Sequence, residues 1–189
     1  MNQKTKTITG MGLLTALVII LQALAISIRF GMFNITLVLV PIIVGAALYG
    51  MLAGAWLGLV FGIIVLFTDA GVFLAVNIPG TIITCILKGI LAGLCAGAIY
   101  HFLQSKNRVV AVVAAGIAAP IVNTGIFLLG CRIFFYDTIK EWAAGLGFES
   151  AGAYLIFGMV GINFIVELAI NLVLSAATVQ IINTILKKR

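Results

Sequence analysis

Long apolar stretches, interrupted by short breaks that contain glycine, proline or polar residues, account for most of the chain. An α-helix needs roughly 20 apolar residues to cross the hydrocarbon core of a bilayer. The pattern predicts an all-α integral membrane protein in which residues 1–189 form a single domain, a bundle of six transmembrane helices. The six predicted spans are Ile8–Ile28, Ile35–Tyr49, Met51–Phe67, Pro79–Phe102, Val109–Phe135 and Tyr154–Leu186.

The second and third predicted spans are shorter than the others, and a tight turn near Gly50 joins them. Two short apolar helices can also enter and leave the membrane on one side, so a re-entrant hairpin is the alternative to two complete crossings. The longest predicted loop, Tyr136–Gly152, separates the last two spans and carries charged and aromatic residues.

Composition and charge placement agree with a membrane protein. Hydrophobic residues make up 63% of the chain and charged residues 8%, with a mean hydropathy of +1.30, which excludes the ordinary soluble globular class. The net charge of +6 reflects basic residues at the ends of the apolar stretches, a distribution typical of cytoplasmic loops rather than of nucleic-acid binding. We therefore expect both termini on the cytoplasmic side. The basic clusters are Lys4 with Lys6, Lys106 with Arg108, and Lys187–Arg189.

Two charged residues, Lys88 and Glu167, lie deep inside predicted spans. A charge at mid-bilayer costs about 3 kcal/mol on insertion scales. Such a residue is therefore usually paired with another charge or faces a cavity. At 1.5 Å per helical residue, Lys88 lies roughly 13 Å from the outer end of its span and Glu167 roughly 20 Å from that of its own. A lysine side chain is long enough to bridge this offset, so the two charged groups are expected at similar depth.

Asparagines accompany these charges. Asn163, Glu167 and Asn171 recur at intervals of four residues and so share one helix face, while Asn123 lies at comparable depth beside Pro120. One interpretation is a substrate cavity whose floor is this polar layer. The other is a structural salt bridge between Lys88 and Glu167, with the asparagines as interhelical hydrogen-bond partners.

Further polar residues lie on predicted outer loops or span ends and could cap a site that is entered from outside. They include Arg29 and Asp69, while Tyr136 and Trp142 are typical interfacial anchors. The predicted substrate-binding set combines the polar layer with part of this rim: Lys88, Asn123, Asn163, Glu167, Asn34, Asn77 and Arg132.

Glycines recur every four residues in the third and fourth spans. Such spacing lets two helix backbones approach closely in a membrane, where no hydrophobic effect drives helices together. We expect these faces to pack tightly, with a sliding or gating surface as the alternative. The two series are Gly50, Gly54, Gly58 and Gly62, and Gly89, Gly93 and Gly97.

The chain carries no motif of a metalloprotease, serine hydrolase or P-loop ATPase, and no cysteine or histidine spacing that suits a metal. Its three cysteines are best explained as small packing residues. We therefore predict a protein that is not an enzyme, has no catalytic or metal-ligating residue, needs no cofactor in this chain and has no energy source of its own.

Three stretches of the chain are recognisable as a set: Ile8–Leu17, Asn34–Gly45 and the glycine-rich Leu48–Gly62. Through them the chain resembles a substrate-binding S component of an energy-coupling factor (ECF) vitamin transporter. The resemblance implies a multi-pass protein of the prokaryotic plasma membrane that binds a vitamin in its outer half. It also implies docking on a transmembrane coupling subunit that works with two ATPase subunits, which use ATP.

The resemblance further implies a docking motif on the first span, Ala-x-x-x-Ala. The matching positions here are Gly12 and Ala16, so glycine replaces the first alanine of the motif. Among vitamin groups the sequence looks closest to the pantothenate, folate and pyridoxine type. Lys88, Arg29 and Arg132 would suit a carboxylate ligand and favour pantothenate. The alternatives are a structural or assembly membrane protein without a ligand, and a self-sufficient secondary transporter.

Overall fold

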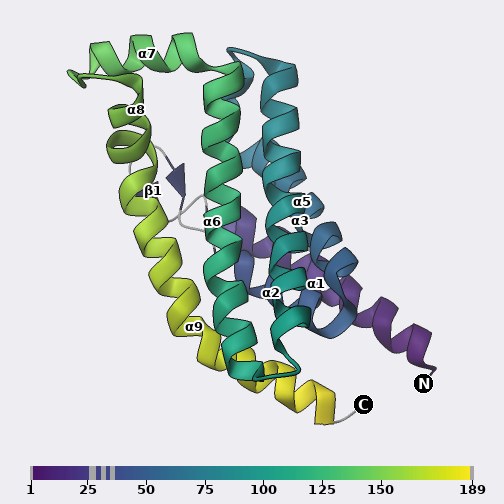
Figure 1. Cartoon of the computed structure of the whole chain (residues 1–189). Coiled ribbons are helices and arrows are strands. Elements are labelled where there is room, and N and C mark those ends of the chain that lie inside the picture. The colour runs from purple at the N-terminus through teal and green to yellow at the C-terminus, as the bar shows by residue number, and fades with distance from the viewer. Residues whose placement is uncertain (1, 26–28, 31–32, 35–36, 188–189) are drawn as a thin grey trace.

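The computed structural model describes residues 2–25, 29–30, 33–34 and 37–187, and most of them are helical. Figure 1 shows a bundle of long helices, with the beginning of α1 and the end of α9 at the same end. The elements in chain order are α1 (Gln3–Ala25), β1 (Arg29–Phe30), β2 (Phe33–Asn34), α2 (Leu39–Tyr49), α3 (Met51–Thr68), α4 (Gly71–Leu74), α5 (Ile78–Leu103), α6 (Arg108–Phe134), α7 (Tyr136–Gly145), α8 (Ala151–Ala153), the π-helix η1 (Tyr154–Val160) and α9 (Gly161–Lys187).

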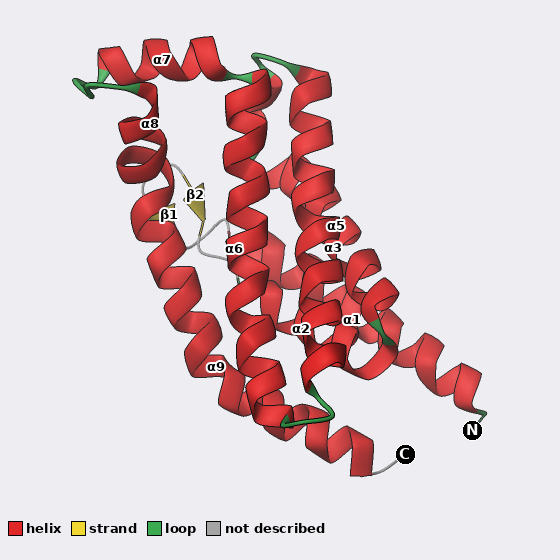
Figure 2. Cartoon of the chain, viewed as in Figure 1, coloured by secondary structure: helices red, strands yellow, loops and turns green. Residues whose placement is uncertain are grey.

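Helices of membrane-spanning length match five of the six predicted spans. Within the described residues these are α1, α3, α5, α6 and the continuous run from α8 through η1 to α9. Figure 2 shows that strand structure in the described chain is confined to the small antiparallel pair β1 and β2. The all-helical prediction therefore holds for the bundle, with this two-residue pairing as a local addition.

The remaining predicted span, the second (Ile35–Tyr49), corresponds to the short helix α2, which has 11 residues. At 1.5 Å per residue it is about 16 Å long, roughly half of the bilayer core, so it cannot cross alone as a straight helix. It is apolar on all sides and nearly all of its residues are buried, as expected for a helix inside a bundle. Gly50, with a φ of 101°, then connects it directly to α3. The number of crossings and the cytoplasmic placement of the termini stay predictions.

The glycine faces of α3 and α5 pack against one another, as the spacing predicted. A Cβ atom added at Gly58 would collide with the backbone carbonyl of Gly89, and one at Gly62 would collide with that of Cys85. Gly54 lies against Gly93 in the same way. The two backbones are therefore in direct contact along three successive turns, which only glycine permits.

The segment predicted as the longest loop, Tyr136–Gly152, is helical over more than half of its length, because α7 lies within it. In Figures 1 and 2, α7 lies across one end of the bundle. Its Ile139 and Ala143, one turn apart, are buried while its charged residues face outward. This amphipathic spacing is typical of a helix at a surface. The helix was not predicted, because the charged residues lower the mean hydropathy of the segment to that of a loop.

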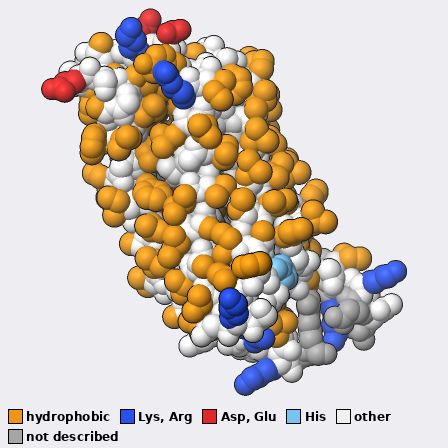
Figure 3. All heavy atoms as spheres, in the orientation of Figure 1, with side chains coloured by type: hydrophobic (Ala, Val, Ile, Leu, Met, Phe, Trp, Pro, Cys, Tyr) orange, Lys and Arg blue, Asp and Glu red, His pale blue; other side chains and the backbone are white. Residues whose placement is uncertain are grey.

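Side-chain type varies along the bundle. Figure 3 shows apolar side chains around the middle of the visible face, basic ones near the two chain ends, and both acidic and basic ones around α7. A hydrophobic belt between two polar ends is the surface that a bilayer requires.

Candidate functional site

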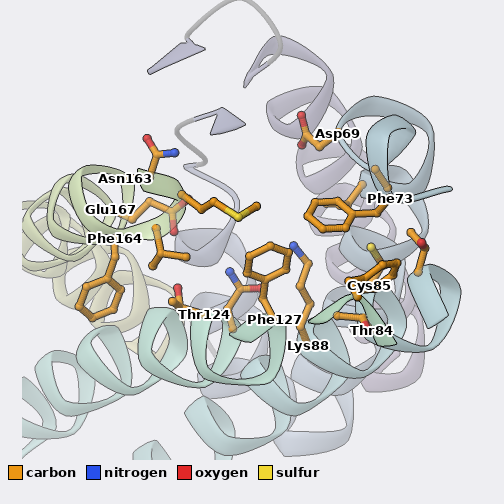
Figure 4. A pocket seen from close by; sticks show the side chains of 17 residues that line it. Asp69, Phe73, Thr84, Cys85, Lys88, Thr124, Phe127, Asn163, Phe164 and Glu167 are labelled. Carbon is orange, nitrogen blue, oxygen red and sulfur yellow. The ribbon is translucent and has the colours of Figure 1, made fainter. Parts of the chain in front are cut away.

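A pocket opens among the helices α3, α5, α6 and α9 on the side nearer α7. It has a cavity volume of about 90 Å³. That space accommodates roughly six to nine water-sized spheres. Figure 4 shows side chains from these helices pointing into it, among them the aromatic ring of Phe127 from α6, together with that of Phe73 from the short helix α4. Its wall is largely apolar, with a few polar groups, which is the usual make-up of a small-molecule site.

Lys88 enters this pocket from α5. Its Nζ lies 5.6 Å from the ring centroid of Phe61 and 5.7 Å from that of Phe127. An ammonium group over an aromatic face is stabilised by about 0.5–2 kcal/mol, with the larger values where water is excluded. The half-buried side chain of Lys88 therefore ends inside the bundle, between two rings from different helices, α3 and α6.

Asn163 and Glu167 enter the pocket from α9, on the face that their four-residue spacing predicted. Glu167 is 7% exposed. Asn171, one turn further along, does not line the pocket; its Nδ2 donates to the backbone carbonyl of Glu167 at 2.8 Å. The asparagine series on α9 thus divides into a pocket-facing part and a part that hydrogen-bonds within the helix.

Asn123 lines the pocket from α6, beside Thr124 and one turn from Phe127. It is 8% exposed. Within α6, Pro120 leaves the carbonyl of Gly116 without its usual helical donor. In the described part of the chain, the side-chain oxygens of Asn123 and Asn163 are buried without a hydrogen-bond partner. A buried acceptor without a donor costs about 1–3 kcal/mol, which marks the pocket as incomplete when empty.

The other predicted site residues do not line this pocket. Asn77 caps α5, because its Oδ1 accepts from the amide of Gly80 at 3.0 Å. Arg132 stacks on the ring of Tyr136, with Cζ 3.9 Å from the centroid. Asn34 lies in β2, and its side chain falls outside the described part of the chain.

Several pocket residues were not in the predicted set. Asp69, noted only as a rim residue, lines the pocket, and its Oδ2 accepts from Nε2 of the fully buried Gln22 on α1 at 2.7 Å. A polar residue in the middle of the first apolar stretch was the sequence signal for Gln22. The apolar lining residues Met159 and Phe164 gave no such signal, because they resemble lipid-facing positions.

The π-helix η1 contributes Met159 and Val160 to the pocket wall. Its wider turn shifts the register of α9 relative to the residues before it. Segments of this kind are frequent at functional sites. Among the described residues, no group of three or more histidine, cysteine or acidic side chains is placed to hold a metal ion.

A helical bundle with a hydrophobic belt and an internal pocket of few, convergent polar groups is the architecture of an integral membrane protein. The sequence comparison agrees with this class: the profile of the family described as "ECF transporter, substrate-specific component" matches residues 6–179. The chain belongs to this family of transport components, which is not a family of enzymes. No curated protein and no solved structure matched in the other two comparisons.

Proposed function

We propose that this protein captures a small water-soluble vitamin or vitamin-like solute outside the cell and delivers it to an ATP-driven ECF module. The observation that carries the proposal is the pocket in which Lys88, Asn123, Asn163 and Glu167 converge from three helices of an otherwise apolar bundle. A structural salt bridge would not need a cavity beside it. Intramembrane polar groups that line a cavity are typical of substrate sites.

Pantothenate is our first candidate among these solutes. Lys88 would bind its carboxylate, and the amide groups of Asn123 and Asn163 would bind its hydroxyl groups. Lys88 is the basic residue that we assign to the carboxylate. Arg132 stacks on Tyr136 outside the pocket, and the side chain of Arg29 lies outside the described part of the chain. Other small water-soluble vitamins share the same requirements.

The proposed partners are a transmembrane coupling subunit and two ATPase subunits, which would supply ATP hydrolysis in the plasma membrane of a prokaryote. The exposed face of α1 supports docking, because Gly12 and Ala16 both lie on it and a Cβ atom at Gly12 would meet nothing within 4 Å. Leu13, 69% exposed, extends the same helix surface. Small residues on an open face allow a partner helix to approach closely.

Reconstitution tests this proposal. The protein, co-expressed with candidate coupling and ATPase subunits and placed in liposomes, should import labelled vitamin only when ATP reaches the ATPases. Gly12→Trp should abolish uptake and co-purification, because the ring would block docking, while vitamin binding to the isolated protein stays unchanged. Gly125→Trp is the matched control, since Gly125 on α6 also has open space around it.

Uptake by this chain alone, driven by an ion gradient, would overturn the proposal in favour of a secondary transporter. A thermal-shift assay separates it from a purely structural protein. A ligand at 100 times its dissociation constant should stabilise the folded state by about 2.7 kcal/mol. A structural protein would show no shift with any vitamin.

A further inference from the structure

The pocket has two chemically different poles. The first, on the α5 side, is the ammonium of Lys88, whose Nζ lies over the rings of Phe61 and Phe127. A lysine ammonium has three donors and no acceptor. An aromatic face stabilises the charge but does not replace a carboxylate or phosphate oxygen as a hydrogen-bond acceptor. This pole therefore suits an anionic group.

The second pole, on the α6 and α9 side, is rich in acceptors. The side-chain oxygens of Asn123 and Asn163 are buried and have no donor in the described part of the chain. Glu167 lines the same side of the pocket from α9, where it has an interaction of its own, so the two asparagine oxygens are the acceptors available to a ligand. Hydroxyl, amide N–H or ammonium groups would satisfy this pole.

The space between the poles is small and apolar. Figure 4 shows the Phe127 ring in the region between the Lys88 and Glu167 side chains. The cavity volume of about 90 Å³ corresponds to six to nine waters, or roughly 180–270 Å³ of liquid. This is the volume of a small metabolite, and a multi-ring coenzyme would not fit.

From these observations we infer that the ligand is a small bipolar solute, with one anionic group held by Lys88 and hydrogen-bond donors at its opposite end held by Asn123 and Asn163. The inference rests on the proposed function, and it adds the orientation of the ligand and the charge it must carry. The inference predicts that neutral and purely cationic vitamins bind more weakly than such a ligand, as do anionic ones without donors at the far end.

Matched ligands test the two poles separately on the full chain in lipid nanodiscs. Pantothenate carries both features, pantothenol lacks the carboxylate, and N-(3,3-dimethylbutanoyl)-β-alanine keeps the carboxylate but lacks the hydroxyls. Nicotinate with nicotinamide, pyridoxal phosphate with pyridoxal, and cationic thiamin extend the panel. Dissociation constants come from calorimetry, and mass spectrometry identifies any molecule that the purified protein carries.

We expect the tightest ligand, from the panel or carried through purification, to be anionic with donors at its far end. Removing its anionic group should weaken binding about 10- to 100-fold, the range of a charge-assisted hydrogen bond. Lys88→Met should abolish this discrimination, binding the anionic and neutral members of a pair alike, whereas Lys88→Arg should retain it. Lys106→Met, in the loop between α5 and α6, is the control and should change nothing.

Asn163→Leu should weaken binding of the ligand with far-end hydroxyls more than that of its analogue without them, with exposed Gln180→Leu on the same helix as the control. A tightest ligand that is neutral, cationic or lacks far-end donors would overturn this inference and leave the proposed function intact. Discrimination that persists in Lys88→Met would also overturn it. Absence of any bound or carried ligand would overturn both.

Discussion

Two regions of the bundle pack in contrasting ways. One is the glycine contact between α3 and α5, called the seam below, and the other is the pocket wall formed by α6 and α9. Along the seam, Gly54, Gly58 and Gly62 bring one backbone against the other with no space for a side chain. Along the pocket wall, Asn123 and Asn163 have buried side-chain oxygens with no donor among the described residues, beside an open cavity. The first region stabilises the fold through contact, whereas the second leaves polar groups that we propose a ligand satisfies.

The two regions meet at Lys88. It lies on α5, one residue before Gly89, which faces the seam, while its own side chain reaches into the pocket. The close contact of α3 with α5 also brings Phe61 of α3 under the ammonium. A rigid seam thus sets the position of the charge that we assign to ligand binding, because close-packed backbones leave little freedom to either helix.

The largest expected effect comes from adding one methyl group to the seam. Gly58→Ala would force its Cβ against the carbonyl of Gly89, and we expect a loss of about 1–3 kcal/mol of unfolding free energy, as for other overpacked sites. Gly125→Ala is the matched control, because nothing lies within 4 Å of its added Cβ. It should be neutral or slightly stabilising, since alanine favours a helix by about 1 kcal/mol over glycine. Equal effects of the two substitutions on denaturant unfolding in detergent would show that the seam is not tightly packed.

A smaller effect on stability, without one on binding, is expected at Asn77. The structure makes it the cap of α5, so Asn77→Ala should cost about 1 kcal/mol of unfolding free energy. The affinity for ligand should stay unchanged, in contrast to Asn163→Leu. Asn77→Asp should restore stability, because aspartate caps a helix equally well. A loss of affinity that exceeds the loss of stability would return Asn77 to the binding site, where the sequence had placed it.

The smallest effect is expected for the direct coupling of Lys88 with Glu167. A double-mutant cycle with Lys88→Met and Glu167→Gln, read out on unfolding without ligand, should give an interaction energy below about 0.5 kcal/mol, the range in which two substitutions are additive. The reason is that the ammonium lies over two phenylalanine rings. Equal destabilisation in the single variants, repaired in the double one with binding intact, would instead identify a structural ion pair.

The sequence predicted the polar layer better than the rim. Lys88, Asn123, Asn163 and Glu167 lie in one pocket, because their depth follows from the rise per residue and their face follows from the helical period. Asn77 and Arg132 have local partners instead, Gly80 and Tyr136, and position in a loop carries no information about such partners. Whether the four pocket residues bind substrate stays a prediction.

Some structural features could not be predicted from the sequence. The π-helix η1 has no sequence signature that separates it from an α-helix, yet it contributes Met159 to the pocket. The helix α7 was not predicted, because its charged residues made the segment resemble a loop. The contact between Gln22 and Asp69 joins residues 47 positions apart, and only the arrangement of α1 against the end of α3 brings them within 2.7 Å.

By itself, the sequence determined that this chain is a bundle of apolar helices, where its glycine faces lie and which polar residues share a depth. Those properties are local, because they follow from hydropathy, helical period and rise per residue. Tertiary structure alone decided that α2 is a short buried helix, that two rings lie under Lys88 and that the polar side chains surround a cavity. The physical reason is that these features depend on how each helix is rotated and how closely it packs against its neighbours, which side-chain shape across the whole bundle determines.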